Sequence, residues 1–168
     1  MLVVTTKKLV STALLAALTC VATMIIKIPS PLNGYINLGD GIVLLAGWLL
    51  SPWLGFLAAG LGSALADILS GYIIYGPATF LIKGLMALVA YYAVKLFPRK
   101  HHTLSARIVS AIAAEILMIA GYFLFAGFLY GFGAAAMNIP ANAVQGVAGI
   151  VIATVLMNIF DKNKSLRP

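Results

Sequence analysis

The chain has 168 residues, of which 62% are hydrophobic and 9% are charged, and its mean hydropathy is +1.06. A water-soluble core cannot bury that much apolar surface, so we expect a lipid bilayer to surround the protein. With about 20 residues per spanning helix, the length allows roughly six or seven spans and no soluble domain. The 11 basic residues outnumber the 4 acidic ones, but they flank apolar runs, so we expect no nucleic-acid partner.

Six apolar segments are predicted to form one all-α domain over residues 1–168, an integral membrane bundle of six helices. The segments are 8–28, 40–51, 54–73, 79–97, 105–130 and 139–160. The second is short, because Ser51-Pro52 interrupts the apolar stretch that it shares with the third. The connections 29–39, 73–78 and 131–138 are rich in turn-forming and small polar residues. The first is long enough to fold over a binding site.

The basic residues predict the orientation of the bundle. They cluster before the first helix at Lys7 and Lys8, around the loop 98–104, and after the last helix. Such clusters mark cytoplasmic segments. Four helices separate the first two clusters and two separate the last two, so all three fall on one side. Both termini are therefore predicted to be cytoplasmic in a multi-pass protein of the bacterial cytoplasmic membrane, and the three connections without Lys or Arg are predicted to face outward.

Four ionisable residues lie within the apolar segments, where a charge costs at least about 2.5–3.5 kcal/mol. Asp40 begins the second helix, and either it or Asn37 is expected to cap the helix N-terminus. Asp67 and Lys83 are predicted to form a structural ion pair between the third and fourth helices, although Lys83 could equally reach a ligand. Glu115 lies deeper than the others and is predicted to contact the ligand.

Polar side chains also follow the start of the last helix. Asn138, Asn142 and Gln145 recur at i, i+4 and i+7, which aligns three amides on one helix face. Hydrogen bonding between helices would explain one such residue, at about 0.6 kcal/mol per contact. A line of three amides exceeds what helix packing needs, so this face is predicted to be a wall of a ligand site.

Several tyrosines fall near the predicted outer ends of the helices, where an aromatic belt at the membrane surface is the ordinary explanation. Tyr122 differs, because it lies seven residues beyond Glu115 on the same helix face and would suit a planar ring. The residues predicted to bind substrate are Asn37, Tyr72, Tyr75, Lys83, Glu115, Tyr122, Asn138, Asn142 and Gln145.

The sequence lacks the common catalytic and cofactor motifs. It has one cysteine, no phosphate-binding Gly-x-x-x-x-Gly-Lys-Ser/Thr loop and no His-Glu-x-x-His zinc motif. We therefore expect no catalytic residue, metal site or cofactor. Two other classes are open to such a sequence: a small intramembrane enzyme that uses Asp40, Asp67, Lys83 or Glu115 as acid or base, and a solitary secondary carrier. Carriers commonly contain inverted repeats, and none is visible here.

Three ordered motifs resemble a known family. They are Tyr-Ile-Asn-Leu-Gly-Asp at 35–40, Gly-Leu-Gly-Ser-Ala-Leu-Ala-Asp at 60–67 with Gly71-Tyr72 after it, and Tyr-Gly-Pro-Ala-Thr-Phe-Leu-Ile-Lys-Gly at 75–84. This pattern, together with six short helices and both ends inside, is similar to the substrate-binding S components of energy-coupling factor (ECF) vitamin transporters. The C-terminal half resembles them mainly in topology.

The resemblance implies a protein that binds a vitamin tightly at its outer face, beneath the 29–39 connection. It implies that a transmembrane coupling subunit and two cytoplasmic ATPase subunits are partners, and that these ATPases, not this chain, bind ATP. The Ala-x-x-x-Ala face at Ala13 and Ala17 would dock on the coupling subunit. Asn-Leu-Gly-Asp with Thr-x-x-x-Lys-Gly most resembles the pyridoxine or hydroxymethylpyrimidine branch, while riboflavin, thiamine and queuine precursors remain alternatives.

Overall fold

The computed structural model describes residues 5–30, 34–97 and 104–162. Two three-residue strands, β1 (Ile28–Ser30) and β2 (Gly34–Ile36), pair as an antiparallel hairpin. The helices are α1 (Thr6–Ile25), α2 (Gly39–Leu49), α3 (Pro52–Leu69), the 3-10 turn η1 (Ile73–Tyr75), α4 (Gly76–Lys95), α5 (Leu104–Tyr130), α6 (Phe132–Ala136) and α7 (Ile139–Lys162).

The predicted membrane bundle of six helices is confirmed. Within the described residues, five helical segments are long and apolar enough to cross a membrane, and α2 is a shorter apolar helix of 11 residues. All six lie within a few residues of their predicted bounds. Ser51 ends the connection between α2 and α3, and Pro52 stands in the first turn of α3, where a missing N–H is tolerated.

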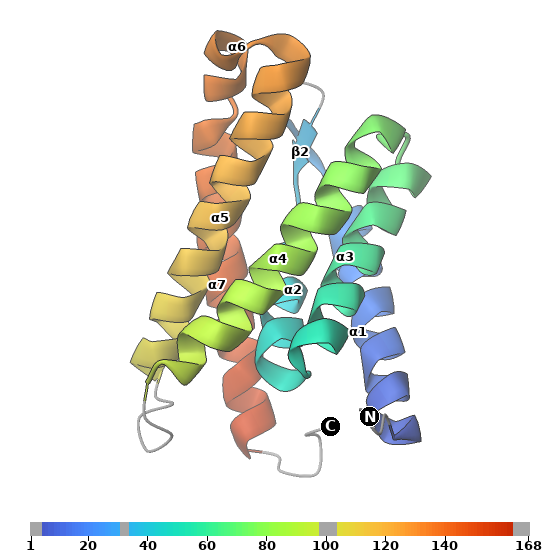
Figure 1. Ribbon diagram of the computed structural model, residues 1–168, viewed down its shortest axis with the longest axis vertical. Coiled ribbons are helices and arrows are strands. Elements are labelled where there is room, and N and C mark those ends of the chain that lie inside the picture. The colour runs from blue at the N-terminus through green and yellow to red at the C-terminus, as the bar shows by residue number, and fades with distance from the viewer. Residues whose placement is uncertain (1–4, 31–33, 98–103, 163–168) are drawn as a thin grey trace.

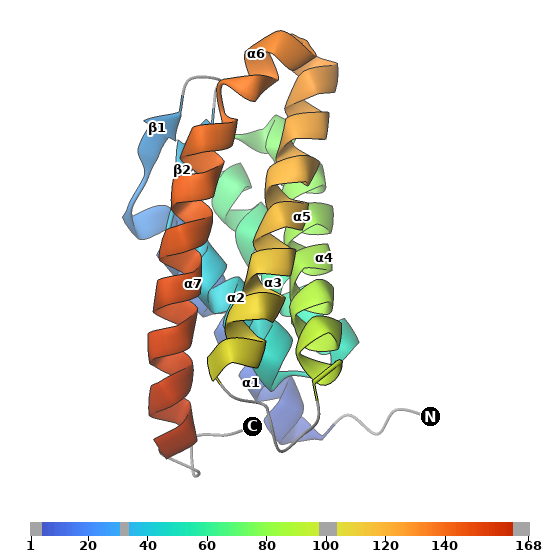
Figure 2. The ribbon, with the colours of Figure 1, turned by 90° about the vertical axis from the view of Figure 1, so that its left-hand side faces the viewer.

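The ends of the helices agree with the predicted number of crossings. The start of α1, the end of α4, the start of α5 and the end of α7 lie at one end of the bundle, and α6 lies at the other (Figure 1). The hairpin lies toward the α6 end, alongside α7 (Figure 2). The side of the membrane that each end faces remains a prediction. The basic residues at 98–103 and 163–168, on which that prediction partly depends, lie outside the described residues.

The short helix α2 occupies the centre of the bundle and packs against α1, α3, α4 and α7. Its Val43 and Leu44 are fully buried, together with Met86 of α4 and Met118 of α5. The outer helices instead expose large apolar side chains such as Ile116. An apolar exterior around a buried polar and apolar centre suits lipid as the solvent.

Two connections contain structure that the sequence pattern did not predict. The 29–39 connection forms the hairpin, and the 131–138 connection contains α6. Both elements are too short for apolar periodicity to indicate them, since three strand residues or five helix residues make barely one repeat. Residues 31–33 of this turn-rich connection lie outside the described residues.

Candidate functional site

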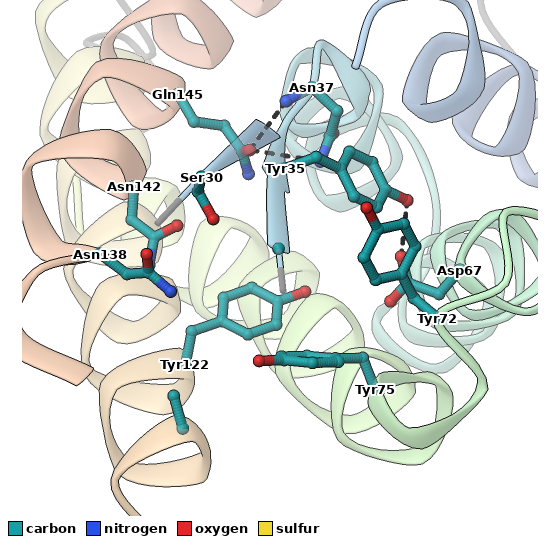
Figure 3. Close-up of a pocket in the computed structure, with 12 residues that line it drawn as sticks. Ser30, Tyr35, Asn37, Asp67, Tyr72, Tyr75, Tyr122, Asn138, Asn142 and Gln145 are labelled. Atoms are coloured by element: carbon teal, nitrogen blue, oxygen red, sulfur yellow. Dashed lines mark hydrogen bonds between the residues drawn. The ribbon is translucent and has the colours of Figure 1, made fainter. Parts of the chain in front are cut away.

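A cavity of about 500 Å³, partly open to the outside, lies between the hairpin, the end of α3 with η1, α5 and the start of α7 (Figure 3). The lining is mostly tyrosines and amides. It consists of Ser30, Gly34, Tyr35, Asn37, Asp67, Tyr72, Tyr75, Tyr122, Ala126, Asn138, Asn142 and Gln145.

The structure brings most of the predicted binding residues together. Seven of them line the cavity, namely Asn37, Tyr72, Tyr75, Tyr122, Asn138, Asn142 and Gln145. Lys83 and Glu115 do not line it. Sequence reasoning missed Tyr35 as a lining residue and assigned Asp67 only a structural role. The signal that could have found both is their position in the motifs at 35–40 and 60–67, which converge on one wall.

Asp67 accepts hydrogen bonds from two hydroxyl groups. Tyr35 of β2 donates to Oδ1 at 2.6 Å, and Thr79 of α4 donates to Oδ2 at 2.5 Å. The Thr79 oxygen also lies 3.0 Å from the Tyr122 hydroxyl. Because the single proton of Thr79 points to Asp67, the Tyr122 hydroxyl must be the donor in that contact. The predicted ion pair of Asp67 with Lys83 is wrong, since Lys83 bonds to another carboxylate.

That carboxylate is Asp40, and its ion pair with Lys83 is almost completely buried. The ammonium group of Lys83 also lies 5.4 Å from the centre of the Tyr122 ring. Asp40 therefore does not cap α2 with its side chain. Asn37 supplies the local bond instead, because its Oδ1 accepts from the N–H of Gly39 at 2.9 Å. The reason is spatial, since α4 passes beside the first turn of α2 and delivers a cation there.

Gln145 connects this ion pair to the floor of the cavity. Its Nε2 donates to Asp40 Oδ2 at 2.8 Å, which fixes the orientation of the amide. The Gln145 Oε1 then accepts from the backbone N–H of Asn37 at 2.9 Å and from its side-chain Nδ2 at 3.2 Å. The chain entering α2 from the hairpin is thereby tied to α7.

Glu115 lies deeper, against the backbone of α7. An added Cβ at Gly146 would lie 3.1 Å from Glu115 Oε2, and one at Gly149 would lie 3.0 Å from Oε1. These glycines allow α7 to approach the carboxylate closely. Within the described part of the chain, neither Glu115 oxygen has a hydrogen-bond partner. The predicted ligand contact of Glu115 would need an opening through the floor that the cavity does not have in this conformation.

The hairpin covers the cavity and is held to α3. The ring centres of Tyr35 and Tyr72 are 4.9 Å apart, and Lys27 donates to the Ser70 hydroxyl at 3.0 Å. Burial, and next the Asp67 carboxylate, raise the pKa of the Tyr35 hydroxyl above its ordinary value. Tyr35 therefore keeps its proton over the physiological pH range and remains a donor to Asp67.

A family model described as the ECF-type riboflavin transporter S component matches residues 3–162. The chain belongs to this family of ECF S components. A solved structure of the S component of a bacterial ECF transporter matches with a TM-score of 0.74 and 27% identity, covering 96% of this chain and 98% of that one.

Two curated relatives also match along most of the chain. An uncharacterized protein from the gap 3′ region of Pyrococcus woesei is 35% identical over 84% of this chain and 93% of its own. The thiamine precursor transporter HmpT of Lactococcus lactis subsp. cremoris is 25% identical over 93% of this chain and 89% of its own.

Membership of the family gives the S component its general role. It is a multi-pass integral membrane protein and the substrate-binding subunit of a vitamin transporter, and it is not an enzyme. S components work with a module made of a transmembrane coupling subunit and ATPases. The predicted docking residues Ala13 and Ala17 are both exposed on α1.

Proposed function

We propose that this S component captures a small heteroaromatic vitamin or vitamin precursor, of the pyridoxine or hydroxymethylpyrimidine class, for uptake across the bacterial cytoplasmic membrane. Tyr72, Tyr75 and Tyr122 offer aromatic faces on which a planar ring can stack. Asn138 and Asn142 stand on the facing wall with groups that both donate and accept hydrogen bonds (Figure 3). Hydroxyl and ring-nitrogen groups of such ligands need both kinds of partner.

The charge of the cavity wall is the observation that carries this proposal. Among the described lining residues, Asp67 is the one carboxylic acid and there is no lysine or arginine. Lys83 lies nearby, but it forms an ion pair with Asp40, which compensates its charge. Phosphate groups are ordinarily bound by arginine, lysine or clustered N–H donors. The site therefore favours an unphosphorylated, neutral or weakly basic ligand.

The similarity to the thiamine precursor transporter HmpT supports the same ligand class, since that relative aligns along 93% of this chain. Riboflavin is the second candidate, because the family model that matches residues 3–162 is described as a riboflavin transporter component. Riboflavin is also planar and unphosphorylated, so the charge of the cavity agrees with either ligand, and only binding measurements separate them.

The partners follow from the family. We propose that the exposed face at Ala13 and Ala17 docks on the transmembrane coupling subunit, and that two cytoplasmic ATPase subunits provide the energy. The chain itself then needs no cofactor, and it binds no ATP.

A binding panel tests the proposed ligand class. Purified protein in detergent is titrated with 4-amino-5-hydroxymethyl-2-methylpyrimidine, pyridoxine, riboflavin and thiamine, with pyridoxal phosphate as the phosphorylated control. The true ligand at 100 times its Kd should stabilise the fold by about 2.7 kcal/mol. We expect the first or second compound to do so and the phosphorylated one to fail. Thermal stabilisation by riboflavin alone would replace the proposed class, and stabilisation by no compound would reject the function.

A further inference from the structure

We propose that Asp67 determines substrate specificity, by accepting a hydrogen bond from an N–H group of the ligand, such as an exocyclic amino group on a heteroaromatic ring. The inference rests on the proposed function, and it specifies which chemical group of the ligand the α3 side of the cavity recognises. Asp67 would thus be a binding residue, where the sequence motif predicted only a structural one.

The Asp67 carboxylate has acceptor capacity that the protein does not use. Asp67 lines the cavity near Tyr72 (Figure 3), and its side chain is 7% exposed. Each of its oxygens accepts one hydrogen bond in the structure, from Tyr35 and from Thr79. An ionised carboxylate offers about four acceptor positions. About two positions therefore remain for a donor that comes from the cavity.

The hydroxyl groups around Asp67 direct their protons to one another and to the carboxylate. Tyr35 and Thr79 donate to Asp67, and Tyr122 donates to Thr79. All three protons are thus used within the wall, and the Tyr122 oxygen is left with its lone pairs. This wall consequently presents acceptors to the cavity. A ligand carbonyl, ether oxygen or phosphate beside Asp67 would find no donor among these three hydroxyl groups, whereas an amino group would meet several acceptors.

Asp67 also forms no ion pair within the described residues. The two ion pairs within the described residues are Lys83 with Asp40 and Arg107 with Asp161, so Asp67 has no cation within 4.0 Å. Its described partners are neutral hydroxyl groups. A buried carboxylate in a membrane protein is expensive unless it is paired or functional. A polarised N–H of a weakly basic ring would add a further donor to those of Tyr35 and Thr79, which ties the choice of ligand to the burial of this group.

The opposite wall differs in character. Asn138 and Asn142 carry amides, each of which has two N–H donors and a carbonyl acceptor. That wall can therefore bind a hydroxyl substituent of the ligand whether the hydroxyl donates or accepts the hydrogen bond. A ring with an amino group toward Asp67 and a hydroxymethyl group toward the amides fits both walls. This pattern narrows the proposed class to hydroxylated aminopyrimidines and disfavours pyridoxine, which has no amino group.

The test uses two probes that differ in one group, 4-amino-5-hydroxymethyl-2-methylpyrimidine and its 4-methoxy analogue, which has no N–H at that position. Their affinities are measured by calorimetry for the full chain and for Asp67→Asn. The unmodified protein should prefer the amino compound by about 10- to 100-fold, the effect of one hydrogen bond to a charged group. Asp67→Asn, which can donate from Nδ2, should reduce that ratio to about one or invert it.

Asp161→Asn is the matched control, since it also changes a carboxylate to an amide but lies at the far end of α7, beside Arg107. Its amino-to-methoxy ratio should equal that of the unmodified protein. An unchanged ratio in Asp67→Asn, or equal binding of both probes by the unmodified protein, would overturn the inference while leaving the proposed function standing. Failure of the unmodified protein to bind any compound of the panel would instead reject the function.

A second variant keeps the test decisive if Asp67→Asn does not fold. Tyr35→Phe removes one donor from Asp67 but retains the carboxylate and the ring. The amino compound should remain preferred at least as strongly as in the unmodified protein, because the carboxylate gains acceptor capacity. A ratio near one in Tyr35→Phe would assign the selectivity to the hydroxyl and contradict the role of Asp67.

Discussion

Lys83 and Asp40 form an ion pair whose side chains are 3% and 0% exposed, in the centre of a lipid-embedded bundle. Gln145 provides a further hydrogen bond to the same aspartate. A buried ion pair of this kind contributes little net stability to the fold. Removal of one partner nevertheless destabilises the protein strongly, because the other charge stays buried without compensation. At the scale of single residues, the partner of each buried charged group thus sets its role. The ion pair of Lys83, the carboxylate of Glu115 and the carboxylate of Asp67 lie in three different environments and are expected to respond differently to substitution.

Lys83→Met should destabilise the protein by about 3–5 kcal/mol, because it leaves Asp40 charged and buried without a cation. Thermal unfolding in detergent measures the loss. Adding Asp40→Asn to the same chain should restore much of the stability, since the amide carries no charge and can still accept from Gln145. If the single variant unfolds at the temperature of the unmodified protein, the pair has no structural importance.

Glu115→Gln should leave ligand affinity within about twofold, because Glu115 does not line the cavity. Its carboxylate has no hydrogen-bond partner among the described residues, so an amide of the same shape should also be tolerated by the fold. Isothermal titration with the best ligand of the panel measures the affinity. A tenfold loss of ligand affinity would instead support the direct contact between Glu115 and the ligand that the sequence predicts.

At the scale of elements, α7 brings the amide wall and the hairpin together because small residues let it approach α2 and α5. An added Cβ at Gly149 would lie 2.7 Å from the Asp40 Cβ. The same helix holds Asn37 through Gln145, while Tyr35 joins the hairpin to α3. The cover of the cavity is therefore attached at two places, and its position depends on how closely α7 packs.

Gly149→Ala should destabilise the bundle by about 1–3 kcal/mol and weaken ligand binding, because the added methyl group forces α7 away from α2. Unfolding temperature and affinity are measured on the same preparation. Gly133→Ala in α6 is the control, since an added Cβ there would meet nothing within 4 Å. Equal effects of the two substitutions would show that close approach of α7 is not what the glycine provides.

At the scale of the whole molecule, the bundle separates a polar interior from an apolar exterior. The cavity lies toward the end of the bundle that carries α6, and both described chain ends lie at the other end (Figure 1). Such a protein can bind a ligand alone, but within its family it works with a coupling subunit and ATPases. Binding and transport should therefore be separable by substitutions on the outside of the bundle.

Ala13→Trp or Ala17→Trp should abolish uptake by the complete transporter while ligand affinity stays unchanged, because a large side chain would block close packing of α1 on the coupling subunit. Uptake into cells and binding to the purified chain are the two measurements. Val147→Trp, on the exposed face of α7, is the control and should leave both intact. Loss of uptake in the control alone would place the docking surface elsewhere.

The amino-acid sequence by itself determined the membrane class, the six helices and most of the cavity lining. In lipid every backbone polar group must be bonded internally, so a long apolar segment has few alternatives to a helix. The i, i+4, i+7 spacing of Asn138, Asn142 and Gln145 then places the three amides on one face whatever the neighbours are.

Only the tertiary structure decided the partners of the buried charges. Asp40 and Lys83 are 43 residues apart, and Asp67 and Thr79 meet across two helices. Which carboxylate meets the lysine depends on the central position of α2 between α4 and α7, a consequence of how the helices pack. Sequence patterns record the face of a helix that is buried, but they contain no information on which neighbouring helix covers that face at a given depth.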